Sequence, residues 1–90
     1  MKFEWDNQKG ASNEKKHGIS FNTAQSLWLD ERRVEIEIAF PSEKRWALIA
    51  SLEGKMWTAI YTIRWDVIRL ISVRRARPRE VGLYEDKTSG

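Results

Sequence analysis

Residues 45–73, RWALIASLEGKMWTAIYTIRWDVIRLISV, decide the fold of this chain. Three segments rich in apolar and β-branched residues, 45–52, 56–63 and 67–73, are separated by two short breaks. Glu53 and Gly54 are typical of a two-residue hairpin turn, because glycine readily adopts the positive φ that such turns require. Trp65 and Asp66 indicate a second, less typical turn. The stretch therefore predicts three consecutive antiparallel strands.

The residues before this stretch add a fourth strand and two helices. Apolar and charged residues alternate over 34–40, as in a half-buried strand, until Pro41 interrupts the pattern. Residues 7–17 contain no proline or β-branched residue and lie between a potential N-cap, Asp6, and Gly18, so they predict a helix. Apolar residues at helical spacing over 22–29, after Ser20, predict a second helix.

Short segments at the two ends complete the predicted fold. Residues 2–5 read as an opening strand, residues 79–84 as a short C-terminal helix after Pro78, and residues 87–90 as a frayed tail. We expect one α+β domain spanning 1–90, in which two N-terminal helices pack on one face of a twisted antiparallel sheet.

The two turns also predict which residues share a face of the sheet. The first turn places Trp46, Leu48 and Ala50 opposite Tyr61, Ala59 and Trp57, and the second places Ala59 opposite Ser72. One face is then almost entirely apolar and is expected to carry the helices. The other face is expected to hold Arg45, Thr62, Arg64, Arg69 and Arg75. Guanidinium groups crowded in this way repel one another unless something anionic lies among them.

The composition narrows the possible functions. The chain has no cysteine, which excludes disulfides, thiolate metal sites and thiol nucleophiles. No apolar segment approaches the length of a membrane span, and the first ten residues lack the apolar core of a signal peptide, so a soluble cytoplasmic protein is expected. The net charge of +3 and the pI of about 9.4 suit RNA, DNA or an acidic protein as partner.

Arginine is concentrated in one part of the chain, with six arginines against one aspartate between Arg64 and Arg79. A guanidinium stays protonated and presents a planar fork that fits phosphate oxygens. RNA cleavage by its own 2′-hydroxyl needs mainly positive charge at the phosphate and proton transfer. The alternative is that these arginines pair with acidic residues of the same chain. His17, the one histidine, is either a helix-end residue or a participant in RNA binding or proton transfer, and no metal-ligand spacing surrounds it.

Two blocks of sequence resemble a known family, the BrnT toxins, from residue 1 to about residue 85. The first block is WDNxK followed by NxxKHGISF, from Trp5 to Phe21, and the second is YTIRWDVIRLISVRRA, from Tyr61 to Ala76. The resemblance implies a fold similar to the RelE-like ribonucleases and RNA cleavage that inhibits translation, with no metal or other cofactor. It also implies a BrnA-like ribbon–helix–helix antitoxin, expected to form a complex of two toxins and two antitoxins that binds operator DNA.

The motif match assigns expected roles to individual residues. The expected catalytic residues are Arg64, Arg69, Arg74 and Arg75, which would bind the scissile phosphate, together with Glu80 and Tyr84 as proton-transfer groups. The expected RNA-binding residues are Lys16, His17, Arg45, Arg77 and Arg79. Two positions depart from the family pattern, because Ile63 replaces an expected glutamate and Trp65 an expected glycine, and both changes are expected to weaken activity or alter substrate preference.

Two further expectations concern partners. Five tryptophans exceed what so small a core needs, so Trp28, Trp46, Trp57 or Trp65 is expected to be exposed as an antitoxin-docking surface. The alternative to an enzyme is a non-catalytic module that holds RNA, DNA or an antitoxin on its basic face. The two differ in a simple test, because an enzyme turns over labelled RNA at substoichiometric amounts and a binding module does not.

Overall fold

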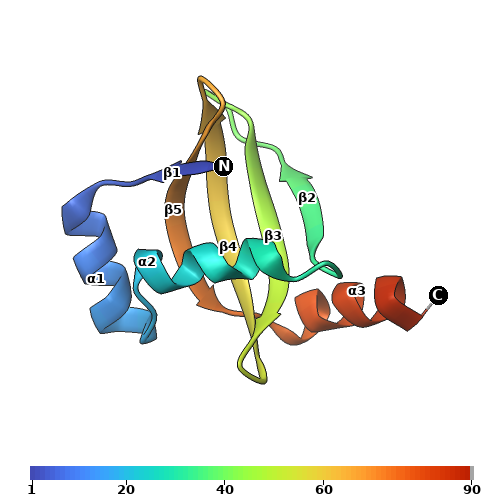
Figure 1. The fold of residues 1–90 in the computed structure, drawn as a ribbon. Helices are drawn as coiled ribbons and strands as arrows, with labels where there is room; N and C mark the ends of the chain where they lie inside the picture. The colour runs from blue at the N-terminus through green and yellow to red at the C-terminus, as the bar shows by residue number, and fades with distance from the viewer. Residues whose placement is uncertain (90) are drawn as a thin grey trace.

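The computed structural model describes residues 1–89 as a five-stranded sheet with three α-helices and one 3-10 helix (Figure 1). The α+β class predicted from the sequence is confirmed. In chain order the elements are β1 (Lys2–Glu4), α1 (Asn7–His17), α2 (Phe21–Ala24), η1 (Gln25–Leu29), β2 (Val34–Ile38), β3 (Arg45–Leu52), β4 (Lys55–Arg64), β5 (Val67–Arg75) and α3 (Pro78–Ser89).

The sheet is mixed and has the strand order β1-β5-β4-β3-β2. The strands β2 to β5 form the predicted antiparallel meander, but β1 pairs with β5 in parallel. The prediction of a wholly antiparallel sheet is therefore wrong at this edge. A parallel partner reaches its place through a long connection, and here α1, α2 and three strands separate β1 from β5, so no local turn signal reveals the pairing.

Both predicted turns are present, and the first fixes the register as expected. Trp46, Leu48 and Ala50 pair with Tyr61, Ala59 and Trp57. The second turn is also formed, but β5 then contains a bulge. Tyr61 pairs with Leu70 and Ile60 with Ser72, which leaves Ile71 as an extra residue on β5. The expected pairing of Ala59 with Ser72 is wrong, because Ala59 pairs with Val73.

The bulge changes which arginines share a face of the sheet. An extra residue reverses the alternation of side chains that follow it. Arg69 and Arg74 therefore point to the same side, with Arg69 paired to Thr62 and Arg74 paired to Thr58. Arg75 pairs with Trp57 and lies on the other side, so its predicted position was wrong. We call the side that carries Arg45, Arg64, Arg69 and Arg74 the arginine face and the other side the apolar face.

The apolar face is covered by α2 and η1, which cross the front of the sheet in Figure 1. Phe21, Leu27 and Trp28 from these segments are buried against Leu48 and Ala59. In contrast, α1 packs beside β5, beyond the three residues of β5 that pair with the short edge strand β1. The prediction that both N-terminal helices cover one face is wrong for α1, whose sequence NQKGASNEKKH has no apolar stripe to bury on a sheet.

The C-terminal helix α3 is longer than predicted, because it runs from Pro78 to Ser89 and includes residues expected to fray. It packs against β2 and β3, and its Glu80 bonds Thr58 on the arginine face. The last residue of the predicted tail, Gly90, lies outside the described residues. Within residues 1–89, no helix combines the length and the apolar character needed to cross a membrane.

Most of the tryptophans serve the core. Trp28 and Trp57 are buried, and Trp5 and Trp46 are partly buried against the same cluster. Edge-to-face contacts link Trp28 to Phe3 and Tyr61, and Trp5 to Phe21. The expectation that Trp28 or Trp57 is an exposed docking residue is therefore wrong, while Trp65 is 97% exposed.

Candidate functional site

The arginine face holds a row of three polar side chains along β5. Arg69, Ser72 and Arg74 follow one another on this side, since the bulge at Ile71 brings Ser72 into register with Ile60 and Arg74 with Thr58. Without the bulge, residues 69 and 74 would lie on opposite faces, because their separation is odd. The bulge therefore places two guanidinium groups on either side of one hydroxyl.

Arg74 is held by a two-point ion pair with Glu80 of α3. Its Nη1 and Nη2 donate to the two carboxylate oxygens at 2.8 and 2.9 Å. The same carboxylate accepts from Thr58 Oγ1 at 3.0 Å and from the backbone N–H of Arg77 at 2.8 Å. The hydrogen bonds from Arg74, despite partial burial, lower the pKa of Glu80 to about 2. Glu80 is thus ionised at neutral pH and fixes the orientation of Arg74.

The other arginines of this face also have carboxylate partners. Arg69 Nη1 bonds Glu4 at 2.8 Å. Arg45 and Arg64 share Glu43, at 3.2 and 3.3 Å. These pairs relieve the repulsion expected from crowded guanidinium groups. The alternative that the arginines between Arg64 and Arg79 pair with acids of the chain is confirmed for Arg64, Arg69 and Arg74. Because an ion pair at a surface contributes little, a phosphate could exchange with these partly exposed carboxylates.

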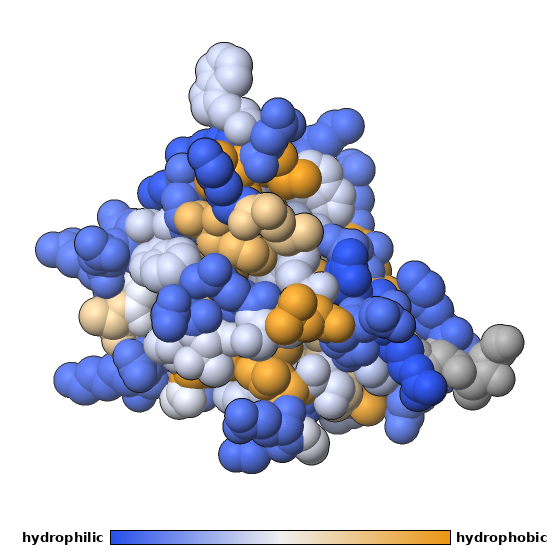
Figure 2. Space-filling model, viewed as in Figure 1, coloured by the Kyte–Doolittle hydropathy of each residue, from blue (hydrophilic) through white to orange (hydrophobic). Residues whose placement is uncertain are grey.

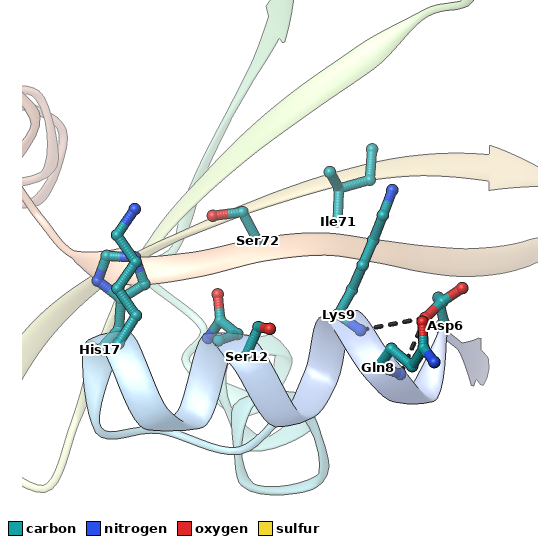
Figure 3. Close-up of a pocket in the computed structure, with 9 residues that line it drawn as sticks. Asp6, Gln8, Lys9, Ser12, His17, Ile71 and Ser72 are labelled. Carbon is teal, nitrogen blue, oxygen red and sulfur yellow. Dashed lines mark hydrogen bonds between the residues drawn. The ribbon is translucent and has the colours of Figure 1, made fainter.

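A groove of about 460 Å³ lies between α1 and the edge of β5 (Figure 3). Lys9 and Ser12 extend from α1 toward β5 in this view, and His17 stands at the end of the helix. The groove is lined by Asp6, Gln8, Lys9, Ser12, Asn13, Lys16, His17, Ile71 and Ser72. Asp6 is occupied as the N-cap of α1, accepting from the backbone N–H groups of Gln8 and Lys9. Ser72 belongs both to this groove and to the arginine row, so the two surfaces adjoin.

The groove has a rigid floor because Asn13 joins α1 to β5. Its side-chain amide donates to the carbonyl of Val73 at 2.9 Å and accepts from the N–H of Val73 at 3.0 Å. It also donates to the carbonyl of Ile19 at 3.3 Å. Asn13 thus bonds the backbone of β5 as a neighbouring strand would. It satisfies the N–H and C=O groups of Val73, which lies beyond the residues of β5 that pair with the short strand β1.

The remaining predicted residues lie around these two surfaces. Arg77 and Arg79 stand at the start of α3 and border an apolar groove that Ile36, Ile38 and Leu83 also line. Arg75 lies on the apolar side, 5.5 Å from the ring of Trp57. The hydroxyl of Tyr84 donates to Asp30 at 2.8 Å, which places it with the loop after η1. Burial and the bond to Asp30 raise the pKa of Tyr84.

Sequence reasoning missed Lys9, Ser12 and Asn13 as groove residues. The signal for Lys9 and Ser12 was their helical spacing relative to Lys16, since residues three, four and seven apart lie on one side of a helix. Asn13 belongs to the sequence block from Trp5 to Phe21, which gives no sign of a bond to β5. Its bonds join residues sixty positions apart, which no local pattern discloses.

Most of this geometry lies in a part of the chain that is similar to a known protein family. Residues 5–80 match the model described as the ribonuclease toxin, BrnT, of type II toxin-antitoxin systems. The chain belongs to the BrnT family. The matched range begins directly after β1, includes α1, the groove, the arginine row and Glu80, and stops before Tyr84. Membership makes this BrnT chain a ribonuclease toxin with an antitoxin partner. No protein with a curated description matches the chain.

Proposed function

We propose that this BrnT chain cleaves RNA at the arginine face through the 2′-hydroxyl of its substrate, without a bound metal ion. The observation that carries the proposal is the row of Arg69, Ser72 and Arg74 next to a groove lined by Lys9, Lys16 and His17. A single strand lying in the groove would bring its backbone past Ser72 to the two guanidinium groups. Family membership supports the reaction class, and the fold is proposed to be RelE-like.

In the proposed reaction the 2′-oxygen attacks the adjacent phosphorus and the bond from phosphorus to the 5′-oxygen breaks. The products are a 2′,3′-cyclic phosphate and a 5′-hydroxyl end. Charge increases on the phosphorane in the transition state, where preorganised cations contribute most. Arg74 is the best prepared residue for this role, because Glu80, whose carboxylate also accepts from Thr58, fixes its guanidinium before substrate binds.

Proton transfer is assigned by what each candidate group can do. Glu80 is a weak base, with a pKa of about 2, and is proposed as the positioning residue for Arg74. Tyr84 donates to Asp30 and would have to leave that bond to donate to the substrate. His17, whose imidazole can both donate and accept, lies in the groove beside Lys16 and is proposed to carry the proton. Tyr84 lies with Asp30 on a different surface and is given no part in this step.

The other predicted cations are proposed to hold the strand outside the cut. Arg45 and Arg64 lie on the arginine face near Glu43, while Arg77 directly precedes α3 and Arg79 lies in its first turn. Arg75, on the opposite side of β5, is proposed to contact the strand only where it leaves the groove. Ile63 is exposed at this end of the sheet and offers no group for proton transfer.

The test is cleavage of a labelled single-stranded RNA by a substoichiometric amount of toxin. We expect multiple turnovers that persist in EDTA, products with cyclic or 3′-phosphate ends, and no cut where the 2′-hydroxyl is replaced by hydrogen. Magnesium-dependent cleavage of DNA would refute the scheme. The non-catalytic alternative is favoured by the carboxylate partners of the arginines, and it predicts a gel shift of RNA with no product.

We also propose a BrnA-like ribbon–helix–helix antitoxin that forms a two-toxin, two-antitoxin complex on operator DNA in the cytoplasm. The apolar groove between α3 and the sheet, with Arg77 and Arg79 at its border, suits an acidic amphipathic segment of such a partner. Co-expression with the neighbouring reading frame should yield this complex. If the chain alone is harmless at high expression and co-purifies with nothing, the toxin proposal fails.

A further inference from the structure

The hairpin between β4 and β5 ends in an unusual turn. Trp65 and Asp66 both have positive φ, 53° and 67°. Two-residue turns of this kind favour glycine or asparagine, and a bulky residue with positive φ is a genuine outlier. The other hairpin follows the rule more closely, with Gly54 at its second turn position.

The side chain of Trp65 makes no packing contacts that would offset the strain of its positive φ. It is 97% exposed, whereas Trp28 and Trp57 are buried. The hairpin lies at the top of Figure 1, and the space-filling view shows the molecule narrowing to a projection there (Figure 2). Strained residues of this kind are found mainly at functional sites, so a role in binding is the natural interpretation.

We propose that Trp65 is a stacking platform for one unpaired base of the RNA substrate. An exposed indole presents a flat aromatic surface, and every nucleobase has a face that can stack on it. The inference rests on the proposed RNA cleavage and adds to it a base contact next to the cut. In this proposal Trp65 binds a base of the substrate and does not contact the phosphate that reacts.

The position of the turn relative to the arginine row supports this assignment. Thr62 pairs with Arg69, and Trp65 follows three residues later along the hairpin. At 3.3 Å per residue this is about 10 Å, so a base on Trp65 belongs to a nucleotide near a phosphate held by Arg69. Cations outnumber acids at this end of the sheet, where Lys2, Lys44, Arg45, Arg64 and Arg69 lie with Glu4, Glu43 and Asp66.

The surroundings favour a nucleic acid over a protein as the occupant. A tryptophan that dominates a protein interface usually lies at the centre of a packed patch that excludes water. Trp65 instead stands at a tip, next to the charged Arg64 and Asp66, with Ile63 as its half-exposed apolar neighbour. A single ring with charged neighbours matches the pattern of proteins that bind single strands.

The test compares Trp65→Gly, Trp65→Phe and a control, Leu29→Ala, which removes another exposed apolar side chain. Glycine relieves the positive φ, so Trp65→Gly should melt at the same or a higher temperature than the wild type. We expect its Kd for an uncleavable 2′-O-methyl RNA to rise about 5- to 150-fold, the loss of one stacked base. The KM for cleavable RNA should rise in parallel, with kcat little changed, while Trp65→Phe and Leu29→Ala stay near wild type.

Fluorescence gives an independent readout. Binding of the 2′-O-methyl RNA should quench tryptophan emission in the wild type, and the Trp65→Phe variant should lose most of that quenching. Wild-type Kd and KM in Trp65→Gly would overturn the stacking role and leave RNA cleavage intact. Normal RNA binding with lost antitoxin binding would make Trp65 a protein contact and overturn it too. A wild-type chain that neither binds nor cuts RNA would overturn both this inference and the proposed function.

Discussion

At the scale of single residues, Arg74 and Arg75 show how strongly position decides the role of a side chain. They are adjacent and chemically identical, yet they point to opposite faces of β5. The side chain of Arg74 is about one fifth exposed and forms a two-point ion pair with Glu80, whereas the guanidinium of Arg75 lies over the ring of Trp57. Each can therefore serve as the control for the other.

We expect Arg74→Ala to lower the cleavage rate by about 10²–10³, the effect of removing one preorganised donor at a developing charge. Arg75→Ala should lower it by no more than about fivefold, the contribution of an exposed ion contact. Single-turnover cleavage of one labelled RNA gives both numbers, and thermal melting shows whether each variant is folded. Equal losses in the two variants would contradict the assignment of faces.

Glu80 gives a second prediction, on stability. Its pKa is lowered to about 2, so its ion pair stabilises the fold above the pKa of the unfolded chain, near 4.3, and that contribution is lost as the pH falls toward 2. We expect Glu80→Gln to reduce the free energy of unfolding by about 2 kcal/mol at pH 7, since a partly buried pair loses less than a fully buried one.

Urea unfolding at a series of pH values tests this. The difference between the wild type and Glu80→Gln should be constant above about pH 5 and should shrink toward zero near pH 2. Glu37→Gln is a suitable control, because Glu37 is exposed on β2. A difference that stays the same at low pH would mean that the charge of Glu80 is not what stabilises the pair.

At the scale of elements, α1 is joined to the sheet by one amide rather than by an apolar face. We expect Asn13→Ala to reduce the free energy of unfolding by about 2–4 kcal/mol, because it leaves buried groups of Val73 and Ile19 without partners. The exposed Asn22→Ala should cost less than about 0.5 kcal/mol. Denaturant unfolding measures both, and hydrogen exchange at Val73 should accelerate only in Asn13→Ala.

Some of these elements could be predicted from the sequence and others could not. The strands of the meander, both turns and the cap at Asp6 depend on neighbouring residues, so local patterns were enough to predict them. The parallel pairing of β1, the place of α1 and the bulge depend on contacts between distant residues, and all three were missed. For the site, the arginines were recognised as a class, but their carboxylate partners and the groove came only from the three-dimensional arrangement.

At the scale of the whole molecule, the net charge of +3 is small for a protein that handles RNA. The groove and the arginine row supply about four phosphate contacts, so the logarithm of RNA affinity should fall with the logarithm of salt concentration with a slope of about −3. Lys9→Ala and Lys16→Ala should each flatten this slope by about 0.7. Arg32→Ala, which removes an exposed cation in the loop between η1 and β2, should leave the slope unchanged, and an equal change in all three variants would argue against a defined path of the RNA.

The bulge at Ile71 has a consequence for how the chain can vary over evolution. The pairs on either side of Ile71 use consecutive residues of β4, Ile60 and Tyr61, so deletion of Ile71 would leave a regular strand in which Arg74 still lies opposite Thr58 and beside Glu80. One residue can therefore be lost or gained at this point without changing the face on which the following residues lie. A one-residue gap at Ile71 in an alignment should leave the roles of Arg74 and Arg75 unchanged.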